Sequence, residues 1–105
     1  MKSIVTDDMD YCFFCGRPAE CNHHLIFGSS NRQKADEDGL IVPACNRCHN
    51  MGLTTMRIHD NVMAEKMSKI LGQMAWEKQR ISEGHTPQEA HTMFYRRYGK
   101  HYLAL

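Results

Sequence analysis

The sequence lacks a long apolar run and a large excess of charge of either sign. Its 105 residues contain 13 Lys and Arg against 12 Asp and Glu, so the formal net charge is +1. No stretch is apolar enough to span a bilayer and no charged-then-apolar leader opens the chain, so we expect a cytoplasmic protein with no membrane partner. Bulk charge does not indicate nucleic-acid binding either, and such a function has to be argued from individual residues.

An even set of cysteines is also lacking. The chain has five, which speaks against a disulfide framework and for a reduced protein. A domain of this length buries a limited core, and a bound metal ion would supplement it. Seven histidines are the most informative excess, because neutral imidazole is a common metal ligand. We expect one domain over residues 1–105, with a flexible lead-in at 1–10, a metal-binding core at 11–59 and a helical part at 60–105.

Two pairs of cysteines have the spacing of zinc knuckles: Cys12 with Cys15, and Cys45 with Cys48. Gly16 follows the first pair and allows the backbone to turn sharply behind it. Four thiolates can hold one tetrahedral zinc ion, whose binding contributes to folding. A redox-active CxxC would explain one pair but not two. Cys21 is left over, either as a small half-buried residue or as a replacement for one of the four.

The residues between and after the knuckles predict an α+β fold. Short strands are expected over 21–27 and 40–43, with a polar loop over 31–39 between them. A long helix should begin at Asp60 or Asn61 and end near Gly84. Its apolar residues recur at helical spacing and are predicted to fill the core: Val62, Met63, Met67, Ile70, Leu71, Met74 and Ile81. Thr86-Pro87-Gln88-Glu89 predicts the capping box of a second helix, with Ala90, Met93, Phe94 and Tyr98 on its apolar side.

Several histidines lie near the knuckles. His23 and His24 are adjacent on the first expected strand, and His49 directly follows the second knuckle. Neighbours on a regular strand point to opposite faces, so the pair can share one site only if the strand twists or bulges. The alternative is one exposed and one hydrogen-bonded core histidine. The three C-terminal histidines are interpreted as ordinary surface or helix-end residues: His85, His91 and His101.

This arrangement resembles the HNH nucleases, the ββα-metal or His-Me finger group. The likeness is to small phage members with CxxCG, an HH pair, an apolar strand and CxxCH. The matching residues are Cys12, Cys15, Gly16, His23, His24, Leu40 to Val42, Cys45, Cys48 and His49. A closing Tyr-Gly-Lys-x-Tyr-Leu at 98–103 is similar to phage proteins grouped with the recombination-enhancement, RecA-dependent nucleases. The resemblance implies a zinc-stapled ββα-metal core with two C-terminal helices.

The resemblance also implies a divalent-metal-dependent DNA endonuclease of phage or prophage recombination or DNA processing. Phosphodiester hydrolysis needs a base that takes a proton from water and a cation that stabilises the developing charge. In the family pattern, His24 corresponds to the base, while His23 and His49 correspond to ligands of a catalytic Mg²⁺ or Mn²⁺ ion. The zinc ion is then structural. DNA is the implied partner, together with a recombinase filament that delivers it.

The chain departs from the family pattern at two positions. Asp38 stands where the middle asparagine precedes the second strand, so Asp38 or Asn31 would have to orient His24. A further ligand often lies four residues after the CH histidine, where this chain has Leu53. His59 either fills that vacancy from the next loop or merely flanks the helix.

Positive residues near the expected site are the candidates for phosphate contact: Arg32, Lys34 and Arg47. Two other functions stay open. The missing middle asparagine favours a catalytically inactive zinc-ribbon module that binds DNA or protein, and the low net charge favours a structural phage adaptor. A chain this small is expected to act as a monomer or a homodimer.

Overall fold

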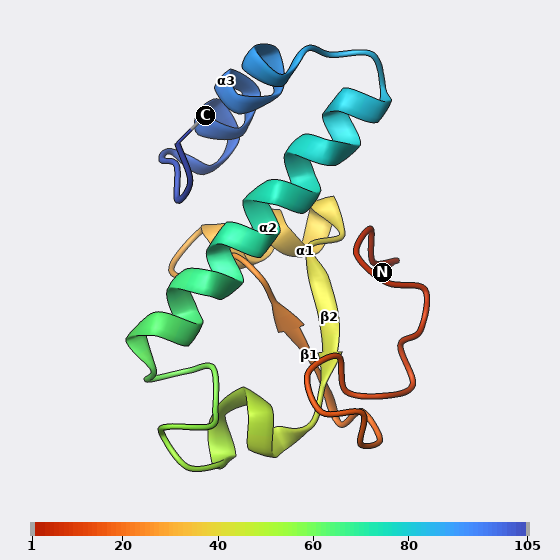
Figure 1. Cartoon of the computed structure of the whole chain (residues 1–105), viewed down its shortest axis with the longest axis vertical. Helices are drawn as coiled ribbons and strands as arrows, with labels where there is room; N and C mark the ends of the chain where they lie inside the picture. The colour runs from red at the N-terminus through yellow and green to blue at the C-terminus, as the bar shows by residue number, and fades with distance from the viewer. Residues whose placement is uncertain (1, 105) are drawn as a thin grey trace.

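The computed structural model describes residues 2–104, which form a small antiparallel sheet surrounded by helices (Figure 1). The elements in chain order are β1 (Cys21–His24), α1 (Asn31–Asp38), β2 (Ile41–Ala44), a short π-helical turn η1 (Arg47–Met51), α2 (Val62–Ser82) and α3 (Pro87–Tyr98). The predicted α+β class, with two C-terminal helices, is confirmed. Within residues 2–104, no helix is long and apolar enough to cross a membrane.

The two strands pair antiparallel, with His23 opposite Val42 and His24 opposite Ile41. β1 is shorter than expected, since it ends at His24, and β2 has the expected length but begins one residue later than predicted. Pro43 is tolerated because both strands of a two-stranded sheet are edge strands. Its carbonyl accepts a hydrogen bond from the Phe13 N–H at 2.8 Å, which attaches the first knuckle to β2.

The predicted loop over 31–39 is wrong, because residues Asn31–Asp38 form helix α1. Its sequence is almost wholly polar, and Ala35 is its one buried residue. No apolar period could therefore reveal it. Gly39 ends the helix with a left-handed φ of 75°, and its N–H reaches the carbonyls of Ala35 and Asp36.

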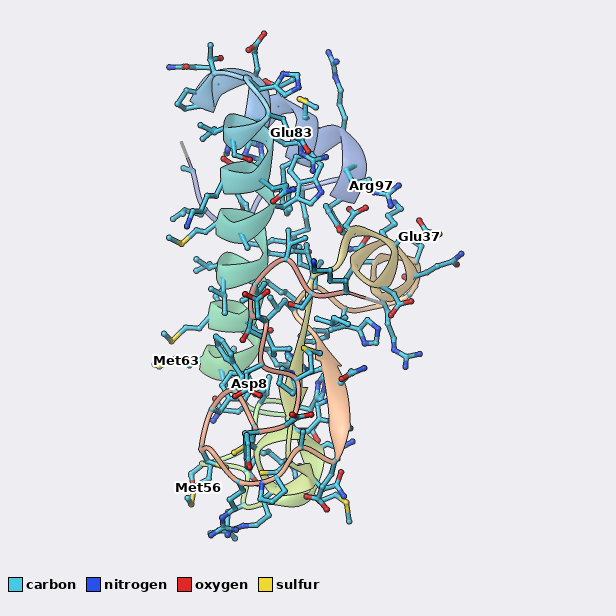
Figure 2. All side chains as sticks on the ribbon, turned by 90° about the vertical axis from the view of Figure 1, so that its right-hand side faces the viewer. Asp8, Glu37, Met56, Met63, Glu83 and Arg97 are labelled. Atoms are coloured by element: carbon cyan, nitrogen blue, oxygen red, sulfur yellow. The ribbon has the colours of Figure 1, made fainter. Side chains whose placement is uncertain are left out.

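Helix α2 is present as predicted, and Asn61 rather than Asp60 caps it, accepting a hydrogen bond from the Ala64 N–H at 3.1 Å. The prediction of its buried face is wrong for the methionines, although Leu71 packs against the core as expected. The exposed fractions of the three methionines expected in the core are 73% for Met63, 63% for Met67 and 54% for Met74. Figure 2 shows Met63 pointing away from the rest of the molecule.

The face of α2 that is buried carries Ser68, Gly72, Gln73 and Trp76. A glycine is needed in this row, because a Cβ on Gly72 would lie 2.8 Å from Cγ1 of Ile26. The close approach lets α2 cross the residues that follow β1. Polar Ser68 and Gln73 are accepted here because each is hydrogen-bonded.

Helix α3 begins with the predicted capping box between Thr86 and Glu89. Ala90, Phe94 and Tyr98 form its buried side. The main core joins residues from every layer: Leu25, Ile26, Ala35, Leu40, Val42, Trp76, Phe94 and Tyr98.

Asp38 connects three helices. Its carboxylate accepts hydrogen bonds from Trp76 Nε1 at 2.9 Å, from the Tyr98 hydroxyl at 2.7 Å and from the Arg97 guanidinium. Arg97 also pairs with Glu37, and the two side chains lie together in Figure 2. Asp38 is thus a structural carboxylate of the core.

Part of the expected lead-in is anchored instead. Ser3 is buried, and its hydroxyl donates a hydrogen bond to the Ile41 carbonyl at 2.6 Å. The Ile4 N–H bonds to the Gly39 carbonyl at 2.9 Å. Ser3 and Ile4 are therefore hydrogen-bonded to residues 39–41, at the start of β2.

Candidate metal centres

The four cysteines of the two knuckles come together at one end of the sheet. One sulfur from each of Cys12, Cys15, Cys45 and Cys48 lies within 4.8 Å of the other three. Gly16 takes the left-handed φ of 80° that the first turn requires, and its N–H bonds to the Cys12 carbonyl at 2.9 Å. Four clustered thiols can hold a structural ion such as zinc. Cys21 lies outside the cluster, half-buried, with its thiol against the Ala44 carbonyl.

The environment of the cysteine cluster favours a thiolate at Cys12. Burial opposes ionisation, but backbone N–H groups of Cys45, Phe14 and Cys15 outweigh it and lower the pKa of Cys12 to about 6. By contrast, burial and the neighbouring cysteines raise the pKa of Cys48. Four thiols this close cannot all ionise without a cation among them, which is the situation that a divalent ion relieves.

Three of the predicted histidine ligands also meet in space. His23 comes from β1, His49 from η1 and His59 from the loop before α2, and one nitrogen of each lies within 4.8 Å of the others. The ring centroids of His23 are 5.3 Å from those of both other histidines. His59 is thus beside the other two histidines, whereas the side chain of Leu53 is exposed.

The orientation of His23 is set by Ser68 on α2. The Ser68 hydroxyl donates to the Leu25 carbonyl at 2.8 Å, so its oxygen accepts from His23 Nε2–H, also at 2.8 Å. His23 Nδ1 is then the unprotonated nitrogen. It is fully buried without a hydrogen-bond partner, on a side chain with no exposed surface. Burial, followed by the charges of His49 and His59, lowers the pKa of His23 to about 3, so the ring is neutral at neutral pH.

The loop that carries His59 is held by Arg57. The Arg57 guanidinium donates to the carbonyls of His59 and Gly52, at 2.9 and 3.1 Å, and pairs with Asp60 at 2.8 Å. The His59 N–H also bonds to the His49 carbonyl at 3.0 Å, so the two ligand segments run side by side. Sequence reasoning missed Arg57, because its role depends on a loop conformation that no local pattern reveals.

A carboxylate lies behind His59. Glu65 Oε2 is 3.6 Å from His59 Nδ1, while His59 Nε2 faces His49 Nε2 at 3.1 Å. A carboxylate behind a ligating histidine orients the ring and raises its basicity. The site thus has three inward nitrogens, with Ser68 and Glu65 as outer partners.

His24 follows His23 on β1, so its side chain leaves the strand in a different direction, yet it is near enough for its charge to contribute, after burial and His59, to the lowered pKa of His49. The Nε2 of His24 is 3.0 Å from Asp36 Oδ1, on the second turn of α1. Neither residue expected to orient it does so: Asp38 bonds Trp76, Arg97 and Tyr98, and no hydrogen bond of the described residues joins Asn31 to His24. Asp36 was missed because its segment was predicted to be a loop.

The predicted phosphate contacts fall in two places. Arg32 lines a pocket with His24 and Asp36, and its charge helps to lower the pKa of His49 after burial, His59 and His24. Lys34 is on the same helix, half-buried. Arg47 lies elsewhere, beside the cysteine cluster, where it lines a pocket with Arg17.

A further positive groove was missed by the sequence. It lies between the start of α2 and the C-terminal segment, and its basic residues are Lys66, Lys69 and Lys100. The Lys69 ammonium is 4.6 Å from the Phe27 ring centroid, and Phe27 packs edge-on against His59 at 4.7 Å. The groove therefore adjoins the histidine cluster.

Comparisons with known protein families, with curated proteins and with solved structures find no match to this chain. What the geometry itself establishes is a small α+β fold with a cysteine cluster able to hold zinc and a separate three-histidine cluster.

Proposed function

We propose that this protein is a divalent-metal-dependent endonuclease of the HNH type that hydrolyses phosphodiester bonds in DNA. The observation that carries the proposal is His23 Nδ1, a buried nitrogen without a partner, on a ring that lies beside those of His49 and His59. An unpaired buried acceptor is costly unless something binds it. Two antiparallel strands followed by a helix agree with the expected ββα arrangement.

The donor set fits a resident ion. His23, His49 and His59 would hold it, leaving coordination positions for substrate and water. Three imidazoles suit a transition ion better than Mg²⁺, which prefers oxygen ligands, so of the two expected ions Mn²⁺ is the better candidate. When bound, the ion would stabilise negative charge on the phosphate oxygens.

His24 is proposed as the general base. Asp36 Oδ1 accepts a hydrogen bond from Nε2–H of His24. This contact fixes the tautomer of His24 and leaves its Nδ1 free to take a proton from water. Asp36 is thus a positioning residue, which orients His24 as the middle asparagine orients the base in the family that the sequence resembles. Arg32, in the same pocket, is placed to hold a phosphate.

The basic groove extends the proposed DNA path. Lys66, Lys69 and Lys100 lead away from His59 along α2, so a strand bound at the histidines would meet them next. Phosphate contacts by these residues would make binding strongly salt-dependent. Delivery of DNA by a recombinase filament belongs to the same proposal.

Nicking of supercoiled plasmid tests the chemistry. Wild type should nick DNA with Mn²⁺ added, and His24→Ala should lose the activity while keeping its zinc and its fold. Asp36→Asn should reduce the rate by about 10- to 100-fold, the usual effect of removing an outer partner. His85→Ala, on a half-exposed histidine outside both clusters, should match wild type. Equal activity of wild type and His24→Ala would overturn the assignment of the base.

A second candidate is a zinc-ribbon binding module without catalysis. The feature that favours it is the pocket beside the cysteine cluster, where Arg17 and Arg47 stand together. If the protein is such a module, His24→Ala should leave DNA binding intact, and the double variant Arg17→Gln with Arg47→Gln should weaken it. If the protein is the nuclease, the double variant Lys69→Gln with Lys100→Gln should lose more DNA affinity than the double arginine variant. Fluorescence anisotropy over a range of salt concentrations separates the two.

A further inference from the structure

The C-terminal part of the chain holds a second group of histidines. His91 on α3 and His101 beyond it have ring centroids 4.2 Å apart, and His101 Nδ1 contacts His91 Nε2 directly. The sequence predicts both to be ordinary surface or helix-end residues. Neither belongs to the three-histidine cluster, although His101 lines the groove that holds Lys66, Lys69 and Lys100.

Glu77 determines which ring nitrogen of His91 carries the proton. His91 Nδ1 is 3.2 Å from Glu77 Oε2 on α2, and both side chains are largely buried. Glu77 also accepts from Gln73 Nε2 at 2.7 Å, so it acts as an acceptor toward both groups. His91 therefore carries its proton on Nδ1 and presents a lone pair at Nε2, toward His101.

Hydrogen bonds to Gln73 hold the C-terminal segment in the position that brings His101 to His91. The buried Gln73 side chain accepts from the N–H groups of Tyr102 and Leu103, at 2.7 and 2.9 Å, and donates to the Leu103 carbonyl at 2.8 Å. Gly99, with a φ of 83°, reverses the chain after α3 and brings His101 back over the helix. The meeting of His91 and His101 thus follows from buried contacts.

We propose that His91 and His101 form a second histidine site, which binds a divalent transition-metal ion and joins α3 to the C-terminal segment. His91 Nε2 and His101 Nδ1 are the two protein ligands, and Glu77 is the outer carboxylate that ligating histidines commonly have. His101 is exposed, so water can complete the coordination. Imidazole donors select ions such as Zn²⁺, Ni²⁺ and Cu²⁺ over Mg²⁺ and Ca²⁺.

Ni²⁺ titration of the zinc-loaded protein tests the site, with isothermal calorimetry and native mass spectrometry as the readouts. Wild type should bind one more Ni²⁺ ion than His101→Gln or His91→Gln. His85→Gln is the matched control and should bind as wild type does. Since His101 is exposed, its replacement leaves the core intact, and a circular dichroism spectrum checks this.

A second measurement is the midpoint of thermal unfolding. Ni²⁺ should raise it more in wild type than in His101→Gln, because the ion pins the C-terminal segment. His59→Gln should lose a different ion, so failure at the proposed catalytic centre is distinguishable from failure here. Equal Ni²⁺ stoichiometry in wild type, His91→Gln and His101→Gln would overturn the proposal and leave an ordinary hydrogen bond between two histidines.

Discussion

At the residue scale, the arrangement of the histidine cluster depends on three residues outside it. Ser68 fixes the tautomer of His23, Glu65 lies behind His59, and Arg57 holds the loop between His49 and His59. Each contact restricts one ring or one stretch of backbone. The three nitrogens can therefore face one another before any ion arrives, which lowers the entropic cost of binding.

Arg57→Ala should weaken Mn²⁺ or Ni²⁺ binding at the three histidines by about 10- to 100-fold, the range typical of lost outer-shell support. Its guanidinium connects His59, Gly52 and Asp60, so without it the loop samples more conformations. Calorimetric titration measures the affinity, and zinc content should not change. Arg96→Ala, at an exposed position of α3, is the control. An unchanged affinity in Arg57→Ala would show that the loop holds its shape without the arginine.

At the element scale, α2 buries a row of small and polar residues and exposes its methionines. The sequence period correctly indicated a helix but not which face packs, because Gly72 and Ser68 are not counted as apolar. Gly72 allows α2 to approach Ile26 closely, and the Ser68 hydroxyl accepts the hydrogen bond from the His23 ring. Packing distance and hydrogen bonding decided the face, not hydrophobicity alone.

Gly72→Ala should destabilise the protein by about 1–3 kcal/mol, the usual cost of overpacking. Alanine gains about 1 kcal/mol in helix propensity over glycine, so steric conflict with Ile26 has to exceed that gain. Urea unfolding of the zinc-loaded protein measures the change. Lys78→Ala, on an exposed position of the same helix, should alter stability by less than about 0.5 kcal/mol. A stabilised Gly72→Ala would mean that α2 moves away from Ile26 without cost.

Asp38→Ala should cost about 3 kcal/mol or more, since it removes the acceptor of Trp76, Tyr98 and Arg97 together. Asp7→Ala, an exposed carboxylate, is the comparison and should be near neutral. Urea unfolding again gives the free energy. If both variants unfold at the same urea concentration, the connection of α1 to α2 and α3 does not depend on this carboxylate.

At the scale of the whole molecule, two centres of order share the fold. One is the apolar core between the sheet, α1, α2 and α3, and the other is the cysteine cluster with Ala44. The second contains almost no apolar side chain, so we expect a bound ion to supply its stability. The histidine cluster takes His23 from β1, His49 from η1 and His59 from the loop before α2.

Removal of zinc by a chelator should therefore lower the thermal midpoint and disorder the knuckles first. Cys45→Ser should reproduce this loss, whereas Cys21→Ser should retain zinc because its thiol lies outside the cluster. Metal content and scanning calorimetry are the measurements. Cooperative unfolding at an unchanged temperature after complete zinc loss would contradict a structural role for the ion.

The sequence by itself determined which cysteines cluster, the capping box of α3, the class of fold and the meeting of His23 with His49, and it left open whether His59 joins them. Each is encoded locally, as a chelate spacing, a cap or an apolar run, or is implied by a family resemblance carried by particular residues. Tertiary structure alone decided that Asp36 orients His24, that Asp38 is a core residue, that α2 exposes its methionines and that His101 reaches His91. These contacts depend on which side chains long-range packing brings within a few ångströms of one another, and a local pattern in the sequence carries no information about such distances.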